Sequence, residues 1–219
     1  MSISNTQLKR QLKRLEQDTL RMGALVEQSF RLSNQALFQR DLAAVQAIPY
    51  LDKQIDQFYR QIESDCVLLI TLQAPASQDS RLIGAFMQLI RDLERIGDYA
   101  KDISEIAAQL FPYQNHAILI KIMPQIELMF HHAQAMLATS LTALSELDAE
   151  VGKRVKELDS TVDDLYEQIY QNLARQRDIQ GSVEPFLLIV LAIRHLERMA
   201  DHATNIGQRV AYIVIGHRP

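Results

Sequence analysis

A nearly identical stretch occurs twice in this chain, and this repetition constrains the fold more than any other feature. The first copy reads Arg-Asp-Leu-Glu-Arg-Ile-Gly-Asp from Arg91 to Asp98, and the second reads Arg-His-Leu-Glu-Arg-Met-Ala-Asp from Arg194 to Asp201. In both copies acids recur at positions i and i+4, which lie on one face of a helix. Self-similarity over this distance predicts a duplicated helical unit rather than a solenoid of short repeats.

The repetition extends upstream of the motif. Four further positions repeat with one common offset of 107 residues: Asp41 and Asp148, Asp52 and Asp159, Asp56 and Asp163, and Tyr59 and Tyr166. The motifs themselves are 103 residues apart, so the loop between the second and third helices is four residues shorter in the second half. We therefore expect an all-α protein of two tandem, pseudo-symmetric, antiparallel three-helix bundles, one in residues 1–111 and one in residues 112–219.

The chain is predicted to be helical throughout. Glycine and proline are rare, with 7 and 6 occurrences, and no segment alternates apolar and polar residues as a half-buried strand does. Asp41 and Asp148 suit helix N-caps, Ser77 or Asp79 suits a third, and Pro49 is expected to kink its helix. The six expected helices are 6–39, 41–72, 77–110, 117–146, 148–177 and one that has Pro185 in its first turn and ends at about 215.

Composition and charge exclude several classes of protein. A net charge of −4 gives no basic field for nucleic acid. The single cysteine, Cys66, allows no internal disulfide and is predicted to be a small buried residue. The polar stretch 1–17 does not resemble a secretion signal, and the apolar run 186–193 is too short to span a bilayer. We expect a cytoplasmic protein that does not insert into a membrane.

The second helix of each half carries an acidic pair of its own. If that pair faces the pair on the third helix, four carboxylates meet in each half. Two carboxylates about 5 Å apart at an effective dielectric of about 20 repel by roughly 3 kcal/mol, so four together need protons, arginines or a cation. An all-oxygen ligand set suits Mg²⁺, Mn²⁺ or iron. The candidate metal ligands are Asp52, Asp56, Glu94 and Asp98 in the first half, and Asp159, Asp163, Glu197 and Asp201 in the second.

A plainer interpretation is a solvated helix face on which arginines pair with these acids at spacing i, i+3, worth a few tenths of a kcal/mol per pair. The second copy keeps the glutamate and the aspartate but has Thr204 for Lys101 and Asn205 for Asp102. The acids are kept in both copies while some of the charged residues around them are replaced. This pattern favours a metal site over a solvated face. Both interpretations stay open at this point.

The remaining residues and motifs give weaker evidence for a functional site. His195 and His202 project away from the acids on their helix, so they are predicted to be surface or interface residues, with metal ligation as the alternative. No glutamate has a histidine three residues on, as a ferritin-like di-iron site requires. No glycine-rich phosphate loop or nucleophile elbow occurs, and no residue is assigned a catalytic role.

The two motif helices, over residues 93–100 and 196–206, resemble the twin motifs of the PhoU family of phosphate-specific transport system accessory proteins. The resemblance extends to Ala74-Pro75 with Asp79 and Arg81, to the acids of the second helices, and to Gly216, and it covers essentially the whole chain. It implies a cytoplasmic, usually dimeric, non-enzymatic repressor of the phosphate regulon. The implied partners are the ATPase subunit of the phosphate ABC importer and the sensor histidine kinase.

The resemblance also implies metal ions at the acidic motifs, as iron or zinc clusters in some members and as magnesium or manganese in others. Carried over by position, the ligands are the eight acids named above, with Asp102 and Asn205 as second-tier candidates one turn further along. Two alternative functions remain: a carboxylate-bound metalloenzyme acting on phosphoesters, and a metal-free helical adaptor whose acids form a docking face.

Overall fold

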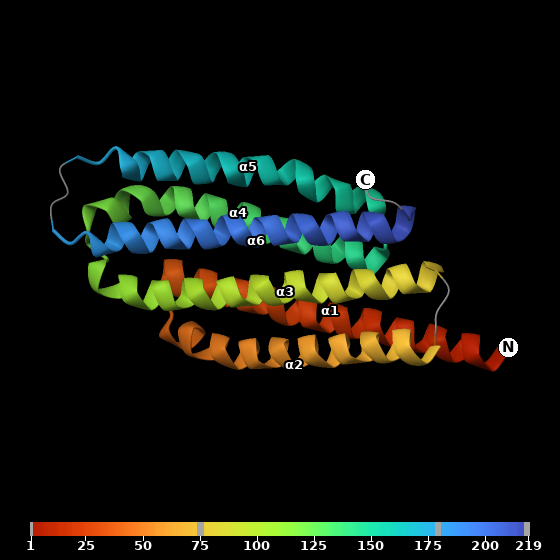
Figure 1. Ribbon diagram of the computed structural model, residues 1–219. Helices are drawn as coiled ribbons and strands as arrows, with labels where there is room; N and C mark the ends of the chain where they lie inside the picture. The colour runs from red at the N-terminus through yellow and green to blue at the C-terminus, as the bar shows by residue number, and fades with distance from the viewer. Residues whose placement is uncertain (1, 74–76, 178–180, 217–219) are drawn as a thin grey trace.

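The protein is a pair of three-helix bundles packed side by side. The computed structural model describes residues 2–73, 77–177 and 181–216. Within these ranges the elements are α1 (Ser2–Gln39), α2 (Leu42–Gln73), α3 (Ser77–Leu110), a single 3₁₀ turn η1 (Phe111–Tyr113), α4 (Ala117–Glu146), α5 (Ala149–Ala174) and α6 (Glu184–Ile215), with no strand (Figure 1). The all-α prediction is therefore confirmed.

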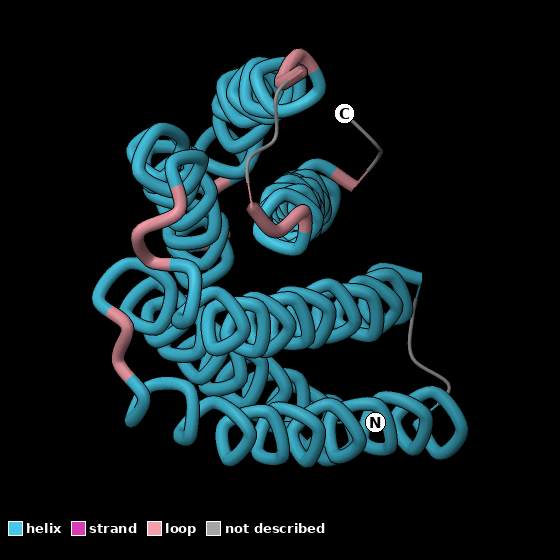
Figure 2. The backbone as a smooth tube through the Cα atoms, turned by 90° about the vertical axis from the view of Figure 1, so that its left-hand side faces the viewer, coloured by secondary structure: helices cyan, strands magenta, loops and turns pink. Residues whose placement is uncertain are grey.

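Each bundle contains three consecutive helices. Helices α1, α2 and α3 pack against one another, as do α4, α5 and α6, and the two bundles meet where α3 contacts α6 and α1 contacts α4. Figure 2 shows the two groups one above the other, with α2 and α5 on the far sides. Within the described residues, no helix is long and apolar enough to cross a membrane.

The duplication is visible in the backbone at the start of α2 and of α5. The side chains of Asp41 and Asp148 each accept bonds from the first free N–H groups of their helix, as expected of N-caps. The helix before each cap ends in a left-handed residue that is not glycine: Arg40 with φ of 57° and Leu147 with φ of 50°. These two residues are also 107 positions apart, so the same tight turn was copied in each half.

The core residues of α3 and α6 hold the acids at the edge of the core. Leu93 and Ile96 are fully buried in the first bundle, and their counterparts Leu196 and Met199 are buried in the second. Each fully buried side chain of this size contributes about 1.5–3 kcal/mol. Because successive helical residues are about 100° apart, an acid that directly follows a core leucine lies on the flank of the helix, between solvent and core.

Helices α5 and α6 approach each other more closely than side chains normally permit. A Cβ atom on Gly207 would lie 2.5 Å from the carbonyl oxygen of Gly152, backbone against backbone. The corresponding positions in the first bundle are Val45 and Ser104, so this pair of glycines is not repeated there. The crossing sets the separation of α5 and α6.

Helix boundaries differ from expectation at two places. Helix α1 begins at Ser2, four residues early, because its polar start has no apolar periodicity from which a boundary can be recognised. Helix α5 ends at Ala174 rather than 177, and the N–H of Gln176 donates to the carbonyl oxygen of Leu173. Helix α2 continues past Pro49 as expected, and the kink at Pro49 stays a prediction. The break at 74–76 lies outside the described residues, as does the predicted cap of α3 by the Ser77 side chain.

Candidate functional site

The first acid cluster comprises Asp52 and Asp56 on α2 with Glu94 and Asp98 on α3. Burial raises the pKa of Glu94, and the charges of Asp98, Asp56 and Asp52 raise it further, while Arg95 opposes the shift. The pKa of Asp98 is likewise raised by burial and, against the opposing charge of Arg95, by Asp52 and Asp56. The charges of both α2 acids therefore raise the pKa of each α3 acid, as expected for two acidic pairs that share one face.

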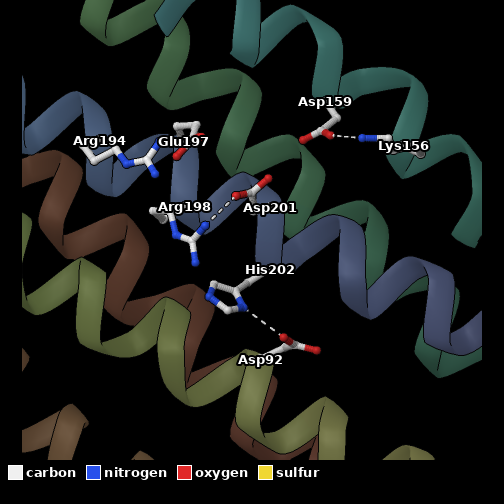
Figure 3. A network of polar contacts seen from close by, with 8 residues as sticks. All are labelled: Asp92, Lys156, Asp159, Arg194, Glu197, Arg198, Asp201 and His202. Atoms are coloured by element: carbon white, nitrogen blue, oxygen red, sulfur yellow. Dashed lines mark hydrogen bonds and ion pairs between the residues drawn. The ribbon is translucent and has the colours of Figure 1, made fainter.

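The second acid cluster comprises Asp159 and Asp163 on α5 with Glu197 and Asp201 on α6. Burial raises the pKa of Asp163, as do the charges of Asp159 on its own helix and Asp201 on the next. The pKa of Glu197 is raised by burial, by Asp201 and by Asp163. Figure 3 shows the Asp159 carboxylate projecting from α5 on the side of α6 that carries Glu197 and Asp201.

One lysine in each half neutralises the first aspartate of the cluster, which the sequence analysis did not predict. Lys101 Nζ on α3 lies 2.8 Å from Asp52 Oδ2 across the helix pair. In the second half Lys156, one turn before Asp159 on α5 itself, makes the equivalent contact (Figure 3). The i, i+3 spacing of Lys156 and Asp159 was a usable signal; the contact of Lys101 depends on tertiary packing.

Arginines also pair with the acids, as the plainer interpretation of the sequence expected. Arg194 Nη1 lies 2.8 Å from Glu197 Oε1, and Arg198 Nη1 lies 3.2 Å from Asp201 Oδ2. In the first half Arg95 contacts both acids of α3, with 3.4 Å to Asp98. These pairs are partly exposed and worth about 0–1 kcal/mol each. They reduce the repulsion within the clusters without removing it.

Two carboxylate oxygens of the second acid cluster, Asp159 Oδ1 and Glu197 Oε2, accept no hydrogen bond from any of the described residues. Both atoms are buried, and the Asp159 side chain as a whole is only 4% exposed. Leaving such a group unsatisfied costs about 1–3 kcal/mol. A hard cation between α5 and α6 would use these oxygens, so the donor chemistry fits a metal such as Mg²⁺ or Mn²⁺.

The coordination shell is not preassembled. Among the described residues, no three histidine, cysteine or acidic side chains already converge closely enough to hold a metal. The acids of each cluster are electrostatic neighbours whose oxygens point partly toward arginine and lysine. A metal would require rotation of these side chains and displacement of the lysine.

The two histidines of α6 lie at the interface between the bundles, as predicted. His202 Nδ1 is 2.9 Å from Asp92 Oδ1 on α3 (Figure 3). The other carboxylate oxygen of Asp92 accepts a hydrogen bond from Arg209 Nε at 3.2 Å. His195 lies 3.9 Å from Asp102, and burial lowers the pKa of His195. Asp92, which the sequence analysis did not single out, is the buried acid that joins the bundles.

The remaining predicted site residues and the cysteine have simple environments. Asp102, a second-tier candidate, is half-exposed beside His195. Asn205, the other one, lines a cleft described below. Cys66 is buried, and burial raises the pKa of its thiol to about 12, so it is an inert core residue as predicted.

Two copies of a three-helix bundle, each with carboxylates that face one another across its second and third helices, define a class of duplicated all-α proteins with paired acidic sites. Comparison with known proteins identifies the class. The model of the PhoU domain matches this chain twice, at residues 19–107 and 126–210. The chain belongs to the PhoU family.

Relatives and solved structures agree along most of the chain. A phosphate-specific transport system accessory protein PhoU homolog from Synechocystis is 58% identical over 94% of this chain and 91% of its own length. A homolog from Pseudomonas aeruginosa is 31% identical over 96% and 86%. The crystal structure of PhoU from Pseudomonas aeruginosa has a TM-score of 0.86 at 31% identity, covering 95% of this chain and 99% of that one. PhoU from Streptococcus pneumoniae also reaches 0.86, at 28% identity over 97% and 99%.

Proposed function

We propose that this chain is a cytoplasmic, non-enzymatic negative regulator of phosphate uptake that binds metal at its two acid clusters. The relatives with which it aligns over 94–96% of its length are named accessory proteins of the phosphate-specific transport system. The observation that supports the metal site is the pair of buried oxygens on Asp159 and Glu197 that accept no hydrogen bond from the described residues. Burial and the neighbouring acids also disfavour the ionised form of Glu197 in the metal-free protein.

The proposed action is that of an adaptor. Long helices with few interruptions offer a firm surface on which the ATPase subunit of a phosphate importer and a sensor histidine kinase can dock, and the protein acts as a homodimer. A bound cation adds positive charge to each acidic face and releases the lysine and arginine side chains that pair with the acids in the metal-free protein. The docking face would then depend on metal occupancy.

The metal site is tested by elemental analysis of protein purified without affinity metals. The pair Asp159→Asn with Glu197→Gln should remove the metal of the second cluster, and Asp52→Asn with Glu94→Gln that of the first. The control is Glu157→Gln, an exposed acid two residues before Asp159 on the same helix. Metal content at the wild-type level in both double variants would refute the assignment.

The regulatory role is tested in a strain that lacks its own PhoU-type protein and carries a phosphate-starvation reporter. Expression of this chain together with its cognate transporter and kinase should restore repression when phosphate is plentiful. The double variants at the acid clusters should restore less repression than Glu157→Gln at equal protein level. A reporter that stays fully active with the wild-type chain would refute the role.

A metal-free adaptor is the second candidate, and the arginine pairs at both clusters favour it. In that case metal-free protein binds the transporter ATPase as tightly as metal-loaded protein. The third possibility, a phosphoesterase, gains no support, because the histidines of α6 are engaged at the interface between the bundles rather than beside the acids.

A further inference from the structure

A cleft of about 750 Å³ lies between the first half of α3, the start of α5 and the end of α6. Four cationic side chains line it: Arg81 from α3, Lys153 and Lys156 from α5, and Arg209 from α6. The other described residues of its wall are Gly84, Ala85, Gln88, Asn205, Gln208 and Tyr212, so no acidic residue within the described ranges lines the cleft. This concentration of positive charge occurs in a chain whose net charge is −4.

The cations keep donors free for a ligand. Arg81 donates to the carbonyl oxygen of Gly216 at 3.1 Å, and Arg209 donates to Asp92. Lys153 contacts Glu150 at 2.8 Å, and Lys156 contacts Asp159. A guanidinium has five N–H donors and an ammonium three, so each side chain uses a minority of its donors in these contacts.

The duplication provides an internal comparison for this cleft. The four cations correspond, at the offsets of 103 and 107 residues, to Glu184, Gln46, Pro49 and Ile106 in the other half. The counterparts of Asn205 and Gln208 are Asp102 and Glu105. The equivalent face, formed by α2 and α3 of the first bundle and the start of α6, therefore has no cation at these positions and three acids: Asp102, Glu105 and Glu184. Both faces are built on the same arrangement of helices. The positive charge of the cleft is therefore not a consequence of the repeated fold but of the residues that differ between the two halves.

We propose that this cleft binds an oxyanion of the phosphate class, either inorganic phosphate and its short polymers or the phosphate groups of a nucleotide. Arginine forks and lysine ammonium groups are the usual partners of phosphate oxygens, and the amides and the tyrosine hydroxyl add neutral donors. The volume falls within the range of about 300–1,000 Å³ that small-molecule sites occupy, so more than one phosphate group fits. This assignment goes beyond the proposed function and requires neither the metal nor the partner proteins.

Lys156 connects the cleft to the second acid cluster. Its ammonium lies at the cleft wall and also compensates Asp159, whose second oxygen has no partner. An anion in the cleft attracts this ammonium away from Asp159 and so favours a cation there. The two sites are therefore coupled in the same direction, and the coupling must be reciprocal. This step rests on the proposed metal site; anion binding itself does not.

The cleft is tested by calorimetric titration of metal-free protein with inorganic phosphate, pyrophosphate and ATP. All three should bind if nucleotides are accepted, and phosphate and pyrophosphate alone if the cleft selects inorganic forms. The double variant Arg81→Gln with Lys153→Gln should weaken binding by about tenfold or more, since each charged hydrogen bond contributes strongly. The control is Lys13→Gln with Lys121→Gln, which removes the same charge from exposed positions on α1 and α4.

A second measurement does not depend on the folding of a variant. In the wild-type protein, pyrophosphate should slow amide hydrogen exchange in 81–88, 152–156 and 205–212 and leave the equivalent face of the first bundle unchanged. Absence of binding at millimolar concentrations of all three probes would refute the proposal, as would equal weakening by the control pair. Binding of a poly-glutamate peptide but of none of the phosphates would also refute it, and would make the cleft a docking site for an acidic protein segment.

The coupling has its own test. Inorganic phosphate is the probe here, because pyrophosphate chelates Mn²⁺ in solution. Lys156→Met should tighten Mn²⁺ binding and weaken phosphate binding, and phosphate should no longer tighten Mn²⁺ binding in this variant. If wild-type protein binds phosphate with the same affinity in the presence and absence of saturating Mn²⁺, the coupling is wrong while the cleft stands. If Mn²⁺ does not bind at all, the proposed metal site fails independently.

Discussion

The close crossing of α5 and α6 gives the sharpest quantitative prediction. Replacing Gly207 with alanine places a Cβ atom 2.5 Å from the carbonyl oxygen of Gly152 and 3.0 Å from a methyl group of Val155. A comfortable carbon–oxygen contact is about 3.3 Å, so the two helices must separate by roughly 0.8 Å. Overpacking of this kind costs about 1–3 kcal/mol, and the upper end applies because both groups at the main contact are backbone.

The gain in helix propensity partly offsets that cost. Alanine is favoured over glycine within a helix by about 1 kcal/mol, so Gly207→Ala should destabilise the protein by about 2 kcal/mol net. For a chain of this size, this loss lowers the melting temperature by about 4–8 °C. Because the same crossing sets the separation of α5 and α6, the variant should also weaken cation binding at the second acid cluster relative to the first.

Gly84→Ala is the matched control. A Cβ atom on Gly84, also within a helix, meets nothing within 4 Å. The same chemical change should therefore raise the melting temperature, by about 2–4 °C. Differential scanning calorimetry of the two variants measures both signs. A Gly207→Ala protein that is as stable as wild type or more stable would show that α5 and α6 are not in backbone contact, and the reasoning would be wrong.

Three further predictions follow from other parts of the molecule. Burial and the charges of Asp201 and Asp163 raise the pKa of Glu197 against the opposing charges of Arg194 and Arg198. Ionised Glu197 therefore destabilises the fold, and this loss develops as pH rises from the pKa of an unfolded glutamate through the raised pKa of the folded state. Glu197→Gln should stabilise metal-free protein by about 0.2–0.5 kcal/mol at pH 7 and by nothing below about pH 4, measured by urea unfolding. A variant less stable than wild type at pH 7 would contradict the raised pKa. Asp92→Ala leaves His202 and Arg209 without their acid and should cost about 2 kcal/mol in the same assay, whereas a neutral effect would show that this interface is unimportant. Leu147→Gly relieves a left-handed conformation and should stabilise by about 0.5–1 kcal/mol; destabilisation would contradict the positive φ.

Features that depend on local pattern could be predicted from the sequence. The i, i+4 acids, the caps at Asp41 and Asp148, and the common offset of the two halves each depend on residues near one another along one helix. They were sufficient for six helices and two bundles. That the acids of α2 face those of α3, and the acids of α5 those of α6, was a condition of the predicted sites and not a result of the sequence pattern. Periodicity specifies which face of a helix is buried, and a repeated periodicity specifies that two bundles bury the same faces.

The contacts between bundles could not be predicted in this way. Asp92, His202 and Arg209 come from helices of different repeats, and their meeting depends on how one bundle rests on the other. The cationic cleft has the same origin, because Arg81 belongs to the first repeat and Lys153 to the second. Duplication gives the structure of each half but leaves open how the halves pack, since either bundle alone contains no signal for its orientation against its copy.

The two halves have the same acids but differ in the residues around them, and these differences distinguish the two clusters. Each cluster has a lysine on its first aspartate, but the lysine comes from α3 in one half and from α5 in the other. The counterpart of Lys101 in the second half is Thr204, and the counterpart of Lys156 in the first half is Pro49. Charge balance was therefore maintained although the residue that provides it changed.

A cation that enters either proposed site must displace this lysine, and the displacement is easier where the lysine is more solvated. The Lys101 side chain is 36% exposed and that of Lys156 is 61% exposed, and Lys156 alone has a cationic cleft beside it in which an anion can hold it. If both proposed sites bind ions, the cation site of the second half is the one whose lysine is displaced more easily and the one whose occupancy can be linked to an anion. The two halves would then respond differently to the same ions, although they are copies of one bundle.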